Sequence, residues 1–304
     1  MIYKTTEAFL AVLLVVPGKP LLTTTQVRLP PGHPIRAQDI CYTGALIALA
    51  LANGLCRKHD DAENMIHDHR PYQMKRLYLA LERRYAAHFI APQLAHLGSG
   101  FHLMKPWNIR LHGDHISLGD NAHIVTADDR QVSLSTWQFE ANSGHIEIGD
   151  NCLLCPGVRI DSASRVKIGD NCMLAAGSYL TDADWHDIYD RTRAVGTTRP
   201  VTLGENVWIG DGAIVCKGVT IGENSVIGAG SVVTQDIPPN VIAAGNPARV
   251  VKTLDPGRTL VTRASIFADR AALARQNDQI DRYVLTRNKL SAWLRTKLFP
   301  RRGD

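Results

Sequence analysis

The chain has 304 residues, of which 45% are hydrophobic and 21% are charged, and this composition excludes a disordered protein. The formal net charge of +5 is unevenly distributed, because residues 1–109 carry +5, residues 110–255 carry −7 and residues 256–304 carry +7. The acidic centre excludes a protein that binds nucleic acid over its whole surface, and no apolar run approaches the roughly 20 residues of a membrane-spanning helix.

Residues 1–108 are expected to form a partly helical N-terminal region. The apolar run Phe9–Val16 lacks the cleavage site of a signal peptide and is expected to be a buried strand, and a helix is predicted over Ala45–Leu55. Apolar residues at helical spacing predict a helix over residues 72–90, ended by Pro92. This region is expected to cap the open strand edges of the repeats that follow. The six cysteines are too few for a disulfide framework, so a reducing, cytoplasmic location is expected.

The middle of the chain is a six-residue repeat with an aliphatic residue first, usually a glycine second, and a small or β-branched residue fifth. The first positions are Leu203, Ile209, Val215, Ile221, Ile227 and Val233. The same frame occurs earlier at Leu118, Ile124, Ile148, Leu154, Ile160, Ile168, Leu174 and Leu180. Two additional residues between Ile160 and Ile168 predict a bulge at a corner. Cys152 and Cys172 occupy the fifth position, so both are expected to be buried side chains.

Each hexapeptide of this kind predicts a short strand and a turn. Three of them return the chain to its starting point, one strand spacing of about 4.8 Å further along an axis. The aliphatic side chains then stack inside a prism, and Gly and Asn occupy corners that need positive φ. A single coil cannot bury its aliphatic face, so the coils must stack. We expect five to six coils between about residue 109 and residue 238.

Residues 181–202 interrupt the repeat, and nothing in a coil requires them. The segment is rich in titratable and aromatic side chains, and a long loop on a rigid scaffold is a typical place for function. His186 is its only histidine. A loop histidine is most often an exposed surface residue, but an imidazole can also accept a proton near neutral pH.

The repeats and the motif Asn206-Val207-Trp208-Ile209-Gly210 after the loop resemble the hexapeptide-repeat acyltransferases, in particular the galactoside, maltose and xenobiotic O-acetyltransferase branch. The resemblance covers residues 109–254 and implies a mainly β fold, a left-handed parallel β-helix with helical flanks, whereas the general crossover rule alone favours the right hand. It also implies a homotrimer with active sites between subunits. The implied reaction is direct acetyl transfer from acetyl-CoA to a hydroxyl of a small-molecule acceptor, such as a carbohydrate. His186 would be the general base, and the backbone N–H of Asp211 would bind the oxyanion.

The resemblance also assigns residues to coenzyme A. The positions that contact the pantetheine arm are matched by Trp208, Ala229 and Thr234, and the basic residues at the nucleotide end by Arg249 and Lys252. Gln235 replaces a common lysine of the family, so one phosphate contact is expected to be missing. Two of these residues could have a structural role instead of binding coenzyme A. Trp208 could pack on a neighbouring subunit, and Arg249 could form an ordinary surface salt bridge.

The acceptor site is where the resemblance is weakest. Sugar-acetylating relatives place an Asn and an Asp on the coil before the loop; Asp161 lies close to the Asp position, but Pro156 falls near the Asn position. Within the loop, the acidic and aromatic side chains around His186 are expected to line the acceptor site: Asp182, Asp184, Trp185, Asp187 and Tyr189. These side chains equally suit a loop packed against another subunit. Trp137 and Glu140 form a second candidate wall.

Other functions stay open at this point. The closest alternative is an N-acetyltransferase acting on an amino sugar or another amine, and a non-catalytic β-helix scaffold is a further one. A carbonic-anhydrase-like enzyme of the same fold requires a His-x4-His pair, which no two histidines of this chain form. Cys152 and Cys155 are two residues of a zinc motif that no second pair completes, so no metal is expected.

Residues 255–304 are expected to form a basic helical extension. Helical spacing places Ile266, Leu273, Ile280 and Val284 on one side of the first part, and Leu290, Trp293, Leu294 and Leu298 alternate with basic residues in the second. Two interpretations stay open: a contact with an anionic membrane or acidic partner, or packing on the acidic prism of the protein's own trimer, which the charge of −7 favours.

Overall fold

The computed structural model describes residues 68–139 and 142–301. The expected strand Phe9–Val16, the expected helix Ala45–Leu55 and the candidate residue Glu140 lie outside the described residues. The chain divides into two compact units. One is Tyr72–Ile280, and the described part of the other is residues 68–71 and 281–301.

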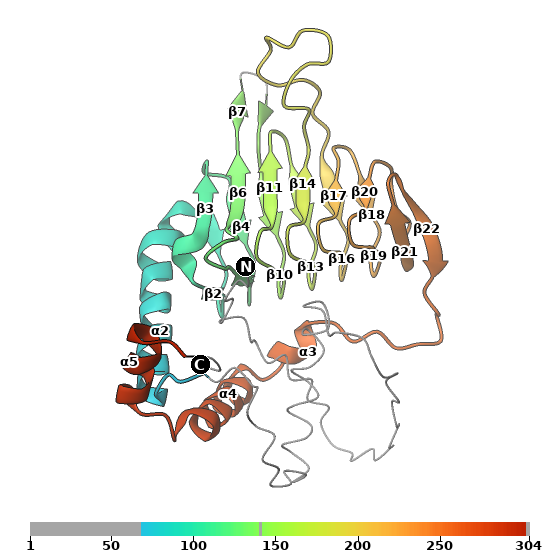
Figure 1. Cartoon of the computed structure of the whole chain (residues 1–304). Coiled ribbons are helices and arrows are strands. Elements are labelled where there is room, and N and C mark those ends of the chain that lie inside the picture. Colours follow the sequence, from blue (N-terminus) through green and yellow to red (C-terminus); the bar gives the residue numbers. More distant parts are fainter. Residues whose placement is uncertain (1–67, 140–141, 302–304) are drawn as a thin grey trace. The chain divides into compact units, whose positions relative to one another are not determined.

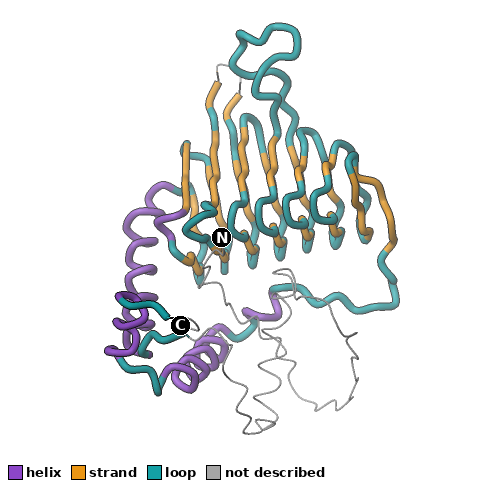
Figure 2. The backbone as a smooth tube through the Cα atoms, in the orientation of Figure 1, coloured by secondary structure: helices purple, strands orange, loops and turns teal. Residues whose placement is uncertain are grey.

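The unit Tyr72–Ile280 is built on a three-sided prism of short parallel strands (Figure 1, Figure 2). Sheet A contains β1 (His96–Leu97), β4 (Ile116–Leu118), β9 (Ile146–Ile148), β12 (Val166–Ile168), β15 (Val201–Leu203) and β18 (Thr220–Ile221). Sheet B contains β2 (His102–Met104), β5 (His123–Val125), β10 (Leu153–Leu154), β13 (Met173–Leu174), β16 (Trp208–Ile209), β19 (Val226–Ile227), β21 (Val241–Gly245) and β22 (Ala248–Thr253). Sheet C contains β3 (Ile109–His112), β6 (Val132–Thr136), β11 (Arg159–Ser162), β14 (Tyr179–Thr181), β17 (Ile214–Val215) and β20 (Val232–Val233).

The chain passes from sheet A to sheet B to sheet C and back, so each coil adds one strand to every sheet. Two antiparallel pairs depart from this pattern. One is the closing pair β21–β22, and the other is a hairpin of β7 (Gln138–Phe139) and β8 (Asn142–Ser143) that projects beyond β6. β1 and β2 add strands ahead of residue 109. The expected parallel β-helix with helical flanks is confirmed.

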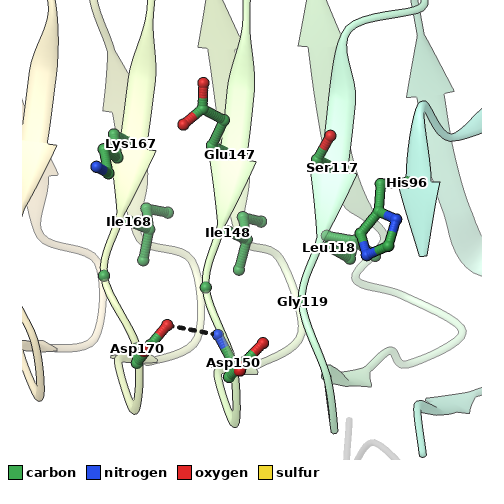
Figure 3. Close-up of a pocket in the computed structure, with 12 residues that line it drawn as sticks. His96, Ser117, Leu118, Gly119, Glu147, Ile148, Asp150, Lys167, Ile168 and Asp170 are labelled. Carbon is green, nitrogen blue, oxygen red and sulfur yellow. Dashed lines mark hydrogen bonds between the residues drawn. The ribbon is translucent and has the colours of Figure 1, made fainter. Parts of the chain in front are cut away.

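The aliphatic ladder of the repeat forms the core of the prism. All the first-position residues predicted from the sequence are at most 3% exposed, from Leu118 to Val233. Figure 3 shows three of them, Leu118, Ile148 and Ile168, on successive strands of sheet A. Cys152 and Cys172 are fully buried, as the fifth position of the repeat predicts.

Asparagine occupies one corner of the prism in coil after coil. Asn121, Asn151, Asn171 and Asn206 have φ between 55° and 62°, a left-handed conformation that asparagine tolerates better than most residues. The preceding aspartates are hydrogen-bonded along the axis. The N–H of Asp120 donates to Asp150 (2.6 Å), and the N–H of Asp150 donates to Asp170 (2.8 Å; Figure 3). These bonds join each coil to the next outside the strands.

The N-terminal flank covers the first coil. The predicted helix over residues 72–90 is confirmed as α2 (Tyr72–Tyr85) followed by a π-helical turn, η3 (Ala86–Ile90). Pro92 lies in the 3₁₀ turn that ends it, η4 (Ala91–Gln93). Ala86 and Ile90 are buried in the hydrophobic core of the prism, so the flank closes the apolar end of the stack. A further 3₁₀ turn, η5 (Pro106–Asn108), leads into β3.

After β22 the chain returns to the first coils as a strap, which we define as residues 254–270. It includes the short helix α3 (Ala264–Phe267) and reaches the start of α4 (Arg270–Leu285). The Nε of Arg263 donates to the backbone O of Asn151 at 2.7 Å, and Arg270 contacts the carboxylate of Asp120 at 3.3 Å. The strap therefore binds the asparagine corner of the early coils.

A buried pair of imidazoles lies near the strap. His102 Nδ1 is 3.2 Å from His123 Nε2. Burial, together with the neighbouring His102 and Arg263, lowers the pKa of His123 to about 3. The His123 ring is therefore uncharged near neutral pH. Burial also lowers the pKa of His102.

In the second unit, residues 281–301 complete α4 and form α5 (Leu290–Leu298). The side-chain amide of Asn288, between these helices, donates to the carbonyls of Asp68 and Arg70. Leu290, Leu294 and Leu298 are exposed on α5, but Trp293 is half-buried. None of the helices in the described ranges combines the length and the apolar character needed to cross a membrane.

Candidate functional site

The segment that interrupts the repeat is a loop with a fixed neck. It leaves the prism after β14 and returns to β15, and Figure 1 shows it projecting beyond the ends of the sheet C strands. Ala183 and Thr198 form an antiparallel bridge at its base. Inside this bridge, the N–H of Asp184 donates to the O of Thr197 (2.9 Å), and the N–H of Gly196 donates to the O of Asp184 (2.8 Å). The two arms of the loop are thus paired where they emerge.

Asp182 fastens the neck to the preceding coil. Its carboxylate is fully buried and accepts hydrogen bonds from Ser162 Oγ (2.6 Å), Ala163 N (2.7 Å) and Ser164 N (3.0 Å). These donors belong to the corner between β11 and β12, which holds the two additional residues that the repeat analysis placed there. Asp182 therefore makes its contacts beneath the loop, with no exposed surface for an acceptor.

Asp184 fastens the neck to the following coil. Its Oδ1 is 2.6 Å from Nζ of Lys217, which lies between β17 and β18, and both side chains are partly exposed. Lys217 is not among the site residues predicted from the sequence, because nothing in the sequence pairs two residues that are 33 positions apart. The two aspartates hold the loop from both sides.

His186 follows this neck directly and is exposed. Its imidazole makes no hydrogen bond to any residue that the structure describes. Its backbone is closely packed, because a Cβ added to Gly196 would lie 2.7 Å from the O of His186. Glycine at position 196 lets the returning arm of the loop approach His186 this closely.

Trp185 belongs to a group of rings that comes from three different coils. Its Nε1 donates to Thr181 Oγ1 (3.1 Å), and its ring centroid lies 6.1 Å from that of Trp137. Trp137, at the base of the β7–β8 hairpin, is 42% exposed and lies 4.5 Å from the ring of His112. We call Trp137, Trp185 and His112 the aromatic cluster.

Asp161 lies on the outer face of sheet C, opposite Thr181 on β14 in the strand register. Its side chain is 4% exposed, and its Oδ2 forms an ion pair with the guanidinium of Arg159 at 2.5 Å. The guanidinium of Arg159 lies 4.8 Å from the centre of the Tyr179 ring and is 59% exposed. Burial raises the pKa of Tyr179, so its hydroxyl stays protonated. A buried carboxylate and an accessible cation thus lie side by side on sheet C.

The remaining predicted acceptor residues lie at the tip of the loop. Asp187 accepts hydrogen bonds from the N–H groups of Tyr189 (2.9 Å) and Asp190 (2.8 Å), and the backbone bonds from Asp190 and Tyr189 lower the pKa of Asp187. The Tyr189 side chain is 97% exposed. Asp187 therefore shapes the tip as a turn, and Tyr189 lies apart from the aromatic cluster.

The residues assigned to the donor lie along sheet B and its next corner. Trp208, on β16, is 40% exposed, and Asp211 lies at the corner between β16 and β17. The O of Asp211 accepts a hydrogen bond from Gly230 (2.7 Å), whereas its N–H donates to no described residue. Gly212, with φ of +63°, has no atom within 4 Å of an added Cβ, so space lies open outside this corner.

Ala229 and Thr234 are exposed on the next coil. Arg249 and Lys252 are exposed on β22, and Arg249 donates to the O of Ala248 at 2.8 Å. Neither of these two cations forms an ion pair with a described residue. They are therefore available to an anionic ligand.

His186 and Asp211 lie toward opposite ends of the sheet C strands. Asp211 precedes β17, whereas the loop leaves the far end of β14, and these strands are parallel neighbours with Tyr179 opposite Ile214. The structure thus gathers the predicted residues into two groups, the loop group on sheet C and the donor group beside sheet B.

A hollow on the prism contains none of the predicted site residues. A hollow on the outer face of sheet A is lined by side chains that include His96, Ser117, Glu147 and Lys167 (Figure 3). In the parts of the chain that the structure describes, no group of three His, Cys, Asp or Glu side chains is placed to hold a metal ion.

Two family models match the repeats. The model described as bacterial transferase hexapeptide (six repeats) matches residues 200–235, and the model described as hexapeptide repeat of succinyl-transferase matches residues 166–182.

Acetyltransferases are similar to parts of the chain. Galactoside O-acetyltransferase of Escherichia coli K12 is 44% identical over 72 residues, which are 23% of this chain and 36% of that protein. The 2,3,4,5-tetrahydropyridine-2,6-dicarboxylate N-acetyltransferase of Alkaliphilus metalliredigens is 50% identical over 56 residues, 18% of this chain and 24% of that protein. Among solved structures, a maltose O-acetyltransferase from Clostridium difficile 630 is 30% identical with a TM-score of 0.36, and the match covers 60% of this chain and 88% of that one.

The chain spans only about a third of the length of the curated relatives that it matches. The two family models match within the hexapeptide coils. Residues 166–182 and 200–235 are therefore hexapeptide repeats of the kind found in bacterial transferases, and the three-sided prism is a left-handed parallel β-helix.

Proposed function

We propose that the protein transfers an acetyl group from acetyl-CoA to a hydroxyl of a carbohydrate-like small molecule, with His186 as the general base. One observation carries the proposal. An exposed imidazole that makes no hydrogen bond to a described residue follows a loop neck held by Asp182 on one side and Asp184 on the other. A base fixed by its backbone and free at its ring suits proton abstraction from a bound acceptor.

The proposed reaction needs no acyl-enzyme. The imidazole of His186 takes the proton of the acceptor hydroxyl while the hydroxyl oxygen forms a bond to the thioester carbonyl carbon. The N–H of Asp211, which donates to no described residue, stabilises the oxyanion. The C–S bond then breaks, and the imidazolium returns its proton to the leaving thiolate. The products are the acetylated acceptor and the free thiol of CoA.

We propose that the site is shared between subunits of a homotrimer. In a single chain, His186 and the Asp211 N–H lie toward opposite ends of the sheet C strands. A second copy of the chain that brings its loop group to the donor group of the first would complete the site. The trimer and the shared site are also what the family resemblance implies.

The donor group suits acetyl-CoA. The corner beside Gly212 is open, and Trp208 and Ala229 present exposed surface next to it for an extended pantetheine arm. Arg249 and Lys252 supply positive charge for phosphates at the end of the prism. Gln235, an exposed amide where the family commonly has a lysine, leaves these two as the cations of the proposed nucleotide end.

The acceptor is proposed to bind between the aromatic cluster and Asp161. Indole rings such as Trp137 provide flat apolar surface for a sugar face, and the carboxylate of Asp161, which is already paired with Arg159, has further lone pairs that can accept hydrogen bonds from hydroxyl groups. Arg159 adds a partly exposed cation beside it. The two tryptophans and the buried carboxylate favour a polyhydroxyl acceptor over a purely apolar one.

The first test is substitution of the base. His186→Ala is expected to lose most turnover in a thiol-release assay while keeping the oligomeric state and CoA affinity, because the ring contacts no described residue. Arg191→Ala, at another exposed position of the same loop, is the matched control and should keep wild-type turnover. Undiminished transfer by His186→Ala would overturn the assignment of the base.

A subunit-mixing experiment tests the shared site. His186→Ala lacks the base, and Ala229→Trp would block the donor side with a bulky side chain. Each variant should be inactive alone, and a mixture reassembled from both should regain activity, since some sites then combine an intact loop group with an intact donor group. Activity that stays absent in demonstrably mixed oligomers would overturn the shared site.

The nature of the acceptor is tested separately. A galactoside O-acetyltransferase and an N-acetyltransferase are both similar to parts of this chain, and an amine acceptor is the closest alternative. A panel of sugars, amino sugars and lipids, analysed by product mass spectrometry, separates O- from N-acetylation. Exclusive acetylation of amines would replace the proposed acceptor hydroxyl. No acetylation, with no consumption of acetyl-CoA, would favour a non-catalytic scaffold.

A further inference from the structure

The C-terminal helix α5 exposes its stripe of leucines instead of packing it on a core. Leu290, Leu294 and Leu298 recur every four residues on one side and are 51%, 44% and 68% exposed. The half-buried side contains Trp293 and Thr296 instead. A helix that used its largest apolar stripe to fold would bury the leucines and expose the threonine. The leucine stripe is therefore directed away from the described part of the fold.

Other apolar side chains close to the stripe in the sequence are also exposed. Phe299, directly after α5, is 69% exposed, and Tyr283 and Val284 at the end of α4 are 74% and 52% exposed. Isolated exposed apolar residues are ordinary on a protein surface. Several exposed apolar side chains on two consecutive helices are instead typical of an interaction surface.

The charges beside the stripe all have one sign. Arg287, Lys289 and Lys297 are exposed, and residues 282–301 contain no aspartate or glutamate. An acidic protein surface without an apolar groove would neutralise the cations but leave the leucines in water. The interface of an anionic bilayer accepts both, since leucines enter the boundary between headgroups and acyl chains while lysines stay among the phosphates.

We propose that α5 is a membrane-interface helix, which binds peripherally to an anionic lipid surface through the stripe Leu290, Leu294 and Leu298 and the cations Arg287, Lys289 and Lys297. The helix lies in the plane of the interface and does not span the bilayer. The consequence is a transferase held at a membrane, with access to acceptors that are anchored there or released beside it. This proposal does not depend on the identity of the general base.

The test is sedimentation of the full chain with vesicles. Vesicles of mixed phosphatidylcholine and phosphatidylglycerol are expected to bind the protein, and vesicles of phosphatidylcholine alone are not. Added salt should weaken binding, because the lysine contribution is electrostatic. Removing one lysine is expected to reduce the partition coefficient about fivefold, so Lys289→Gln combined with Lys297→Gln should reduce it about 25-fold.

Substitutions in the stripe separate the apolar contribution. Leu294→Ser with Leu298→Ser should reduce partitioning by about tenfold or more, because the apolar surface that would enter the interface is lost. Leu294→Met with Leu298→Met is the matched control and should retain binding, since methionine preserves apolar surface and helix propensity. Circular dichroism verifies that both variants stay folded, and acetyl transfer to a soluble acceptor should be the same in both.

Three outcomes would overturn the proposal. One is no binding of the wild-type chain to anionic vesicles, and another is equal binding to both vesicle types. The third is a serine variant that binds vesicles like the wild type but changes the oligomeric state in sedimentation velocity. That last result would assign the stripe to packing within the protein's own trimer.

Discussion

The buried carboxylate of Asp182 allows a quantitative test of how the loop is held. Asp182→Asn preserves the shape of the side chain but replaces one acceptor oxygen with an NH₂ group. Oδ1 accepts from Ala163 N at 2.7 Å, and Oδ2 accepts from Ser162 Oγ at 2.6 Å and from Ser164 N at 3.0 Å. In either orientation of the amide, an NH₂ group faces a backbone N–H, and that N–H loses its acceptor. The Ser162 hydroxyl can rotate and accept instead.

The expected loss follows from these contacts. A buried donor left without a partner costs about 1–3 kcal/mol, and the other bonds lose the strengthening that a charged acceptor gives them. A free-energy loss of about 2–4 kcal/mol is therefore expected, out of the 5–15 kcal/mol typical of a folded domain. For a domain of roughly 200 residues, the melting temperature should fall by about 4–16 °C. Turnover should also fall, because the neck that positions His186 loosens.

Thermal unfolding followed by circular dichroism and the thiol-release assay measure the two effects. Asp187→Asn is the control, because Asp187 also accepts two backbone N–H bonds in the same loop but is partly exposed to water. Water can satisfy the N–H groups left there, so its melting temperature should stay at the wild-type value. Equal melting temperatures for the Asp182 and Asp187 variants would refute the reasoning that burial makes the first carboxylate structural.

Three further predictions concern other parts of the chain. Gly196→Ala brings a Cβ to 2.7 Å from the O of His186, so the loop must shift, and kcat is expected to fall about tenfold to a hundredfold with CoA affinity unchanged in a binding titration. The pKa of His123 is about 3 in the folded protein and 6.5 in the unfolded chain. Between pH 6.5 and pH 3, His123 therefore binds a proton in the unfolded chain but not in the folded protein. The free energy of unfolding should fall as the pH falls through this range. Between pH 6.5 and pH 5, the free energy of unfolding measured in urea should fall by about 2 kcal/mol because of His123. A His123→Gln variant whose free energy of unfolding depends on pH as steeply as that of the wild type would contradict this prediction. Trp137→Ala should raise the KM for a sugar acceptor about fivefold and leave the KM for acetyl-CoA unchanged, and a change confined to acetyl-CoA would remove Trp137 from the acceptor site.

The coils could be predicted from the sequence almost residue by residue. Each coil repeats the same local requirement, an aliphatic side chain inside and an asparagine or glycine at a corner, so short windows already contain the information. Leu118 to Val233 and the asparagine corners follow the predicted frame without exception. The left hand of the helix came only from the family resemblance, because six-residue spacing is the same for either hand.

The arrangement within the loop could not be predicted in the same way. The sequence placed Asp182, Asp184 and Tyr189 together as candidate acceptor residues, because it shows residue types and not the direction in which side chains point. The structure directs the first beneath the loop, pairs the second with Lys217 and exposes the third. The role of His186 stays a prediction that the proposed experiments test.

The C-terminal helices show a related limit. Periodicity placed Trp293 with Leu290 and Leu294 as one apolar group, but the structure separates the tryptophan from the leucines. An amphipathic pattern identifies a stripe, and it does not say whether the stripe is directed inward or outward. That distinction depends on contacts with residues far away in the sequence.

The strap changes how the prism can come apart. In a simple solenoid each coil touches only its neighbours, so either end can fray while the rest stays folded. Here Arg263 and Arg270, which follow the last coil, bind Asn151 and Asp120 near the beginning, 112 and 150 positions back along the chain. The chain therefore forms a closed ring of contacts, and neither end can unravel without releasing the other. A single proteolytic cut between residues 255 and 262 would reopen that ring and is expected to convert one cooperative unfolding transition into fraying from the last coil.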